Sequence, residues 1–310
     1  MNVKNKIKDV ISDPKRFVLS VMMHIARIVN SDTMYLKALY RLYTGEQLNL
    51  RNPKTFNEKT QWLKAFDHNP LYHTLVDKAK VKEYVSNMVG SQYIIPTLGL
   101  WNTFDEIDFS KLPNQFVLKT TNGGGNTGVV ICKDKSLFDR DLAKSKLSKS
   151  MSYDIYKKMG EWVYKDLKPM IIAETYMEDD TVHRLDDYKF FCFNGEPKIL
   201  FFASERINET NEPPKFDYYD MQLNHLDIKS RGHKNSEKRL EPFENFSLMK
   251  DLATKLSRDI PFVRVDFYDI NGHVYFGEMT FYHDSGLVPF EPREWDNTLG
   301  EWINLNSVKL

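Results

Sequence analysis

The sequence predicts an α+β fold in which two lobes follow a mainly helical N-terminal region. Three observations predict it: apolar residues recur at helical spacing over residues 31–92, two later pairs of β-rich runs are each joined by Asn-Gly, and no internal repeat is visible. A chain of 310 residues can form two or three compact units around a sizeable core. We expect the helical region at 1–92, a central lobe at 93–176 and a C-terminal lobe at 177–310.

The composition is that of a soluble protein with balanced charge. Hydrophobic residues make up 41% of the chain and charged residues 28%. The 43 Lys and Arg residues equal the 43 Asp and Glu residues, whereas a dedicated nucleic-acid binder usually has a basic excess. The two cysteines, Cys132 and Cys192, exclude a disulfide scaffold. Because no secretory leader pattern is visible, we expect a cytoplasmic protein.

The first thirty residues form a basic segment with a short apolar run. They contain six Lys or Arg residues and two Asp residues. The apolar run at residues 17–29 is interrupted by Ser20, His24 and Arg27, and it is too short and too polar to span a bilayer. Two interpretations stay open: a helix that docks on the protein with a solvated basic face, or one that lies on an anionic membrane surface.

The N-terminal region is expected to hold three helices. Ser31 or Asp32 supplies the N-cap of the first, which ends at Gly45, and the second starts near Asn57. The third opens at residue 70, where Pro suits the first turn, and runs to residue 90. A continuous third helix would present Lys78 and Lys82, four residues apart, on one face.

Strands are expected from residue 94 onward. The runs 116–119 and 128–132 flank a glycine cluster, residues 136–164 return to a helical composition, and 170–173 form a further strand. Two hairpins follow, one with its turn at Asn194-Gly195 and one with its turn near Asn271-Gly272. Between them, the polar residues 207–243 are expected to form a long surface excursion, and 246–260 a helix.

The glycine cluster has a lysine at its base. Lys119 ends a β-rich run, and four of the six residues from 123 to 128 are glycine. Glycines let backbone N–H groups approach a phosphate closely, and the lysine adds a positive charge beside them. The order differs from a P-loop, because the lysine precedes the glycines and no helix follows directly. A flexible hairpin without a ligand is an equally good interpretation of this cluster alone.

The last hairpin brings acidic side chains together. Arg264 and Asp266 project from one face of the first strand, and Glu278 and Thr280 share a face of the returning strand. The turn brings Asp266 and Glu278 opposite one another or one step apart, with Cβ atoms about 5 Å apart if directly opposed. Facing carboxylates suit Mg²⁺, and Arg264 beside them can stabilise a developing anion. The alternative is a surface salt-bridge cluster around Arg264.

A fourth segment lies between these two motifs. An apolar strand runs into Glu174, Tyr176 and Met177 and then into an acidic stretch. Such a segment can form a hinge between lobes whose backbone reads an adenine edge. Lys189, in the next hairpin, is available for a phosphate.

The chain order of these motifs resembles the ATP-grasp superfamily, whose members clamp ATP between two α+β lobes. The residues of the individual motifs resemble the TupA-like ATP-grasp family, whose members are encoded in bacterial gene sets for teichuronopeptide, capsule and surface polysaccharides. The resemblance covers roughly residues 30–305. The motifs that carry it are 52–59, 77–78, 119–126, 172–174, 187–195 and 278–282.

The resemblance implies a role for each matching residue. ATP phosphates would be contacted by Lys78, Lys119 and Lys189 and covered by a lid of Gly123, Gly124, Gly125 and Asn126. Adenine would bind at Glu174, Tyr176 and Met177, and Mg²⁺ at Asp266, Glu278 and Thr280. The transition state would be stabilised by Arg264 and Lys119. His283, Ser285 and Gly286 would contact the substrate. Thr280 stands where many ATP-grasp ligases have Asn.

The implied activity is an ATP- and Mg²⁺-dependent carboxylate–amine ligation through an acyl phosphate. The acid would be a uronic acid of a bacterial surface polysaccharide or of its precursor, and the amine an amino acid or amino alcohol. A metal-dependent glycosyltransferase, an ATP-dependent phosphotransferase and a nucleotide-binding module without turnover stay open as alternatives. No nucleic-acid partner is expected, and peripheral contact of the N-terminal segment with the cytoplasmic membrane face stays open.

Overall fold

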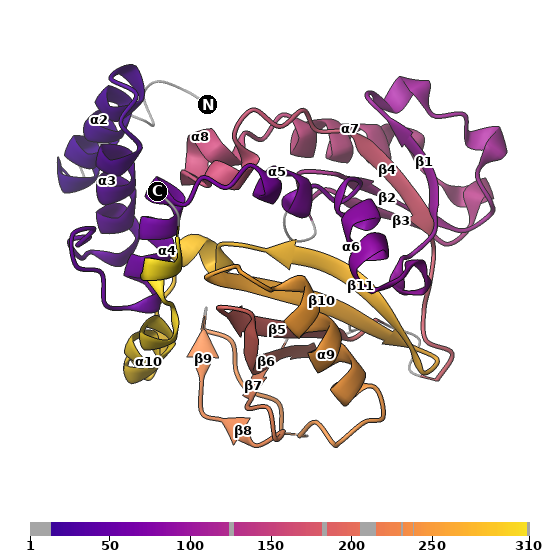
Figure 1. Cartoon of the computed structure of the whole chain (residues 1–310). Helices are drawn as coiled ribbons and strands as arrows, with labels where there is room; N and C mark the ends of the chain where they lie inside the picture. The colour runs from indigo at the N-terminus through magenta and orange to yellow at the C-terminus, as the bar shows by residue number, and fades with distance from the viewer. Residues whose placement is uncertain are drawn as a thin grey trace.

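The described part of the chain forms two large antiparallel sheets, a two-stranded sheet of β9 and β12, and a group of N-terminal helices (Figure 1). This fold is seen in a computed structural model that describes residues 14–123, 127–181, 185–204, 215–230, 232–237 and 239–308. The four-stranded sheet has the order β1-β4-β2-β3, and the six-stranded sheet the order β11-β10-β5-β6-β7-β8. The predicted α+β architecture is therefore confirmed.

The N-terminal helices are α2 (Pro14–Ile28), α3 (Asp32–Thr44), α4 (Phe56–Phe66), α5 (Leu71–Val76) and α6 (Val81–Val89). As predicted, α3 starts at a serine cap, since Ser31 Oγ accepts the N–H of Met34, and it ends at Gly45 in the left-handed conformation. Thr55 and Glu58 form a capping box at the start of α4.

The prediction of one continuous third helix is wrong. The helix breaks after Val76, and Asp77 has an extended backbone with ψ of 117°. Its Oδ1 accepts the N–H groups of Ala79 and Lys80, a local side-chain bond that competes with helix continuation. Lys78 therefore lies between α5 and α6, and it does not share a helix face with Lys82.

The four-stranded sheet carries the glycine loop. Its strands are β1 (Thr97–Trp101), β2 (Phe116–Thr120), β3 (Val129–Cys132) and β4 (Ile171–Thr175). Between β3 and β4 the chain forms α7 (Arg140–Met151), which packs on β2 and β3, and α8 (Ile155–Met159). β1 was not predicted. Burial alternates along β2, so that Phe116 and Leu118 pack in a core with Leu147 of α7, and Lys119 projects from the other face.

The six-stranded sheet contains both predicted hairpins. Its strands are β5 (Asp187–Phe193), β6 (Glu196–Ser204), β7 (Lys215–Tyr219), β8 (His225–Leu226), β10 (Phe262–Ile270) and β11 (His273–Thr280). Asn194-Gly195 and Asn271-Gly272 have positive φ at both positions, as the two-residue turns of twisted hairpins require. α9 (Phe246–Leu256) packs on this sheet, while β9 (Lys229–Ser230), β12 (Phe290–Glu291) and α10 (Glu294–Trp302) complete the lobe. Short 3₁₀ helices lie at Ser91–Tyr93, Phe104–Glu106, Phe109–Lys111, Lys135–Leu137, Trp162–Tyr164, His283–Gly286 and Leu305–Ser307.

The expected surface excursion at 207–243 needs correction. Within its described part, β7 pairs with β6 inside the sheet, and Tyr218 and Tyr219 are buried. Asp217 on the same strand is buried too. Its carboxylate accepts the backbone N–H of Ser236 and forms an ion pair with Arg239. The polar composition therefore concealed a core strand whose carboxylate is satisfied by residues further along the chain.

The N-terminal helix docks on the protein, as one of its two interpretations expects, while the side chains of Lys15 and Arg16 lie outside the described residues. α2 packs along α3 at the edge of the molecule (Figure 1). Ala26 is buried there, while Phe17, Val21 and Ile28 are exposed. The exposed side of α2 therefore carries apolar side chains beside exposed Ser20 and His24. None of the described helices is both long and apolar enough to cross a bilayer.

Candidate active site

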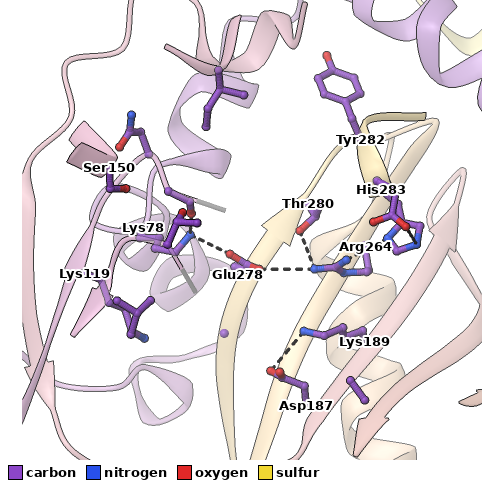
Figure 2. Close-up of a pocket in the computed structure, with 18 of the residues that line it drawn as sticks. Lys78, Lys119, Ser150, Asp187, Lys189, Arg264, Glu278, Thr280, Tyr282 and His283 are labelled. Atoms are coloured by element: carbon purple, nitrogen blue, oxygen red, sulfur yellow. Dashed lines mark hydrogen bonds and ion pairs between the residues drawn. The ribbon is translucent and has the colours of Figure 1, made fainter. Parts of the chain in front are cut away.

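A cleft of about 860 Å³ lies between the two sheets. Figure 2 shows Lys78 and Lys119 on one side of it and Glu278, Arg264 and Lys189 on the other. The predicted residues that line it are Lys78, Lys119, Gly123, Glu174, Tyr176, Met177, Lys189, Arg264, Glu278, Thr280, His283 and Ser285. Asp266 and Gly286 are not among the lining residues. Gly124, Gly125 and Asn126 fall outside the described residues.

On the four-stranded side, Glu174 is held between two lysines. Lys119 Nζ lies 2.6 Å from its Oε2, and Lys82 Nζ contacts its Oε1. Burial opposes ionisation of Glu174, but the charges of Lys119 and Lys82 outweigh it and lower the pKa of this carboxyl. Lys82 also donates to the carbonyl of Ile95. The Glu174 carboxylate thus holds the two cations in place.

Lys78 links the glycine loop to the last hairpin. Its Nζ donates to the carbonyl of Gly123 at 2.5 Å and to Glu278 Oε2 at 2.8 Å. Its own N–H donates to the carbonyl of Thr121, which fixes the α5–α6 turn against the loop. Burial opposes the charge on Glu278, but Lys78 and then Arg264 outweigh it and hold the pKa of Glu278 far below its usual range.

On the six-stranded side, Asp266 lies directly opposite Glu278 in the β10–β11 ladder and opposite Lys189 in the β10–β5 ladder. Its Oδ1 accepts Arg264 Nε at 2.7 Å, and its Oδ2 accepts both Arg264 Nη2 and Lys189 Nζ at 2.7 Å. Arg264 Nη2 also donates to Thr280 Oγ1 at 3.0 Å. The salt-bridge cluster weighed as an alternative is thus present, but it is buried and lies at the cleft rather than on the surface.

The oxygen donors here fit Mg²⁺ in kind and in number. Among the described residues, no group of three His, Cys, Asp or Glu side chains is arranged to hold a metal alone. Mg²⁺ is commonly bound through one or two carboxylates, with water and substrate phosphates completing its shell. Glu278 lines the cleft and can serve directly. Asp266 is 1% exposed with both oxygens bonded, so it can serve only when Lys189 or Arg264 moves aside.

The predicted substrate residues form a left-handed turn after β11. Asp284 and Ser285 have φ of 49° and 58°, and Gly286 has φ of 58°. For non-glycine residues such backbone costs energy and persists only where the surroundings enforce it. His283 Nδ1 lies 3.1 Å from Arg264 Nη1 and so accepts its N–H, while its ring packs on Phe191. This environment favours a structural role for His283.

Two buried side chains of α4 enforce this turn, and the sequence reasoning missed both. Lys64 Nζ donates to the carbonyl and the hydroxyl of Ser285, each at 2.7 Å, and Gln61 Nε2 donates to the carbonyls of Ser285 and Gly286. Lys64 is fully buried, and this burial lowers its pKa to about 8 against the opposing charge of Glu161. The available signal was a lysine between Leu63 and Ala65, both on the buried side of α4.

The cleft also includes side chains from α3 and from the segment around α8. Tyr43 at the end of α3 and Tyr153 before α8 line it and keep 58% and 43% of their surfaces exposed. Met159 and Leu287 line the same cleft. The cleft therefore joins a charged part at the two sheets to a part with apolar and aromatic walls.

The cleft therefore has Lys78, Lys119 and Glu174 on one side and Glu278, Arg264 and Lys189 on the other. The model of the TupA-like ATP-grasp family matches residues 58–304. The chain belongs to this family, and its predicted assignment to the ATP-grasp enzymes is confirmed at that level. No curated protein was found that matches the chain.

The chain is also similar to solved structures of ligases. D-alanine–D-alanine ligase from Bacillus anthracis matches at 16% identity and a TM-score of 0.38, over 67% of this chain and 57% of that one. The same enzyme from Helicobacter pylori matches at 17% and 0.40, over 74% and 58%. D-cycloserine synthetase DcsG matches at 16% and 0.40, over 76% and 72%. The first two matches thus span under two thirds of the neighbour's length, and similarity this low carries no argument about chemistry.

Proposed function

We propose that this protein is an ATP-dependent carboxylate–amine ligase that works through an acyl phosphate. The observation that supports it best is the contact of Lys78 with both Gly123 and Glu278. Through it, the α5–α6 turn, the glycine loop and the last hairpin meet at one cleft. A triphosphate in that cleft would have cations on one side and a carboxylate-bound metal on the other.

The cationic side chains bind and orient the phosphates. Lys78 exchanges its contact with Glu278 for a phosphate oxygen, whereas Lys119 keeps its contact with Glu174 and directs its remaining N–H donors to a phosphate. Glu174 holds Lys119 and Lys82 in position. Arg264, fixed by two bonds to Asp266, offers its guanidinium to the oxygens that gain charge in the transition state. When bound by Glu278 and Asp266, Mg²⁺ supplies further neutralisation of the phosphate charge.

The reaction balances without an enzyme nucleophile. A carboxylate oxygen of the acid attacks the γ-phosphorus, and ADP leaves. The amine nitrogen then attacks the acyl carbon, the C–O bond to phosphate breaks, inorganic phosphate leaves, and the nitrogen loses a proton. Because water would hydrolyse the acyl phosphate, a cleft walled by two sheets suits this chemistry better than an open surface.

We propose a uronic acid of a bacterial surface polysaccharide, or of its precursor, as the acid, and an amino acid or amino alcohol as the amine. Tyr43 and Tyr153 support this choice, because exposed aromatic rings in a cleft offer a flat amphipathic surface to a sugar ring. Ser285, presented by the turn that Lys64 holds, is proposed to contact the acid. We place the reaction in the cytoplasm, where ATP is available.

The test measures ADP and inorganic phosphate released from Mg-ATP in the presence of pools of uronic acids and amines. Phosphate release that requires both an acid and an amine supports ligation. ADP release with the phosphate retained on a product identifies a phosphotransferase instead. UDP release from a sugar nucleotide identifies a glycosyltransferase. Either of these two outcomes overturns the proposal.

A further inference from the structure

Helix α2 carries a stripe of exposed apolar side chains on its outward face. The stripe consists of Phe17, Val18, Val21, Ile25, Ile28 and Val29, each between 40% and 70% exposed. Their spacing of three, four and seven residues places them along one side of the helix. Fifteen large apolar side chains are exposed in the described part of the chain. Six of them lie together here, five on α2 and one, Val29, directly after it.

The opposite face fixes how α2 sits on the protein. Ala26 is buried against α3, and the guanidinium of Arg27 lies 3.6 Å from the ring centre of Tyr35. The same guanidinium donates to the carbonyls of Tyr156 and Lys157, at 2.7 Å and 3.0 Å. These contacts hold α2 at the edge of the molecule (Figure 1) and leave the apolar stripe exposed. Rotating the stripe inward would break all of them.

The same stretch of the sequence carries an excess of positive charge. Residues 1–44 contain eight Lys or Arg residues and three Asp residues, an excess of five positive charges in a chain whose net charge is zero. The remaining residues are therefore acidic by the same amount. A narrow apolar stripe next to a basic segment is the pattern of helices that lie in the interface of an anionic bilayer.

We propose that the stripe of α2 binds the surface of an anionic lipid membrane. The charge complementarity selects this occupant over a second copy of the chain, because two copies would bring two basic segments together. The stripe lies on one convex helix. It can therefore bind a lipid interface, which offers no groove that matches a helix. This binding orients the whole protein at the membrane without a spanning segment.

The test sediments the full-length protein with vesicles of phosphatidylcholine alone or of phosphatidylcholine mixed with phosphatidylserine. We expect binding to the mixed vesicles that weakens by about tenfold or more at high salt, and little binding to the neutral vesicles. The triple variant Val21→Ser, Ile25→Ser, Ile28→Ser should bind the mixed vesicles at least about tenfold more weakly. A matched control, Leu137→Ser with Leu142→Ser, removes two exposed apolar side chains elsewhere and should bind as the parent does.

Thermal unfolding and ATP turnover with soluble substrates check that the triple variant is folded and that any loss is specific to the membrane. No sedimentation of the parent with mixed vesicles overturns the proposal whatever the variant does. Equal binding by parent and triple variant also overturns it. A dimer of the parent that the triple variant abolishes, without vesicle binding, assigns the stripe to a second copy instead.

Discussion

Lys78 Nζ lies 2.8 Å from Glu278 Oε2, although the two residues are 200 positions apart in the chain. The same nitrogen reaches the carbonyl of Gly123. This ammonium group therefore sits where the glycine loop and the acidic hairpin approach each other.

Replacing Lys78 with alanine should raise the KM for ATP by about tenfold or more and lower kcat, because a phosphate-binding cation is lost next to Glu278. Steady-state kinetics with varied ATP measures both. Lys80→Ala is the matched control, since Lys80 is exposed two residues further along and should behave as the parent. An unchanged KM and kcat in Lys78→Ala would remove this residue from the phosphate site.

Asp266→Asn and Lys119→Ala should each reduce turnover by at least ~10²-fold while the fold is kept. Asn keeps the shape of Asp266 but removes the charge that fixes Arg264 and Lys189. Turnover is measured by phosphate release, and thermal unfolding reports on the fold. Asp269→Asn on the same strand is the control. Near-parental rates in Asp266→Asn or Lys119→Ala would refute the role of that residue.

Glu174→Gln should destabilise the protein by about 3 kcal/mol at neutral pH, because Lys119 and Lys82 lose their buried partner. The folded-state pKa of Glu174 lies below the usual value of 4.5, so its stabilising contribution is present above pH 4.5 and is lost as the pH falls through the lowered pKa. Urea unfolding of parent and variant across this range should therefore show a difference that shrinks toward acid pH. A difference that is constant with pH would contradict the ion-pair account, and exposed Glu301→Gln serves as the control.

Lys64→Met should raise the KM for the acid by about tenfold while the KM for ATP stays unchanged, because Lys64 positions the turn at Ser285 without touching the nucleotide side. Met keeps most of the buried side-chain volume but not the donors. The readout is the separate variation of acid and ATP in the coupled phosphate assay. If both constants change together, Lys64 acts through general stability, and exposed Lys54→Met controls for loss of a surface charge.

The parts of the fold that were predictable depend on local chemistry. Asn194-Gly195 and Asn271-Gly272 encode their turns within two residues, and alternation along the flanking strands fixes which side chains face each other. The sequence left Asp266 and Glu278 opposite one another or one step apart. Regular pairing from the turn would put Asp266 opposite Gly277, and a bulge between Asp266 and Phe267 brings Glu278 to the opposite position. Ser31 as a helix cap is similarly local.

The parts that were not predictable depend on partners distant in the chain. Lys64 and Lys82 look like ordinary helix lysines, and only their contacts with Ser285 and Glu174 show what they do. The break at Asp77 required knowing that its carboxylate bonds locally and that Lys78 meets the glycine loop. Packing is one reason for glycine at position 123, because a Cβ there would clash with the Thr120 hydroxyl.

The most direct test of the proposed chemistry uses an acid substrate with its carboxylate labelled with ¹⁸O, together with Mg-ATP and an amine. Ligation through an acyl phosphate transfers a labelled oxygen from the acid to the released phosphate, because the P–O bond that forms in the first step survives when the acyl C–O bond breaks. Mass spectrometry of the phosphate should find one ¹⁸O per product molecule formed. Amide formation with unlabelled phosphate would contradict the account.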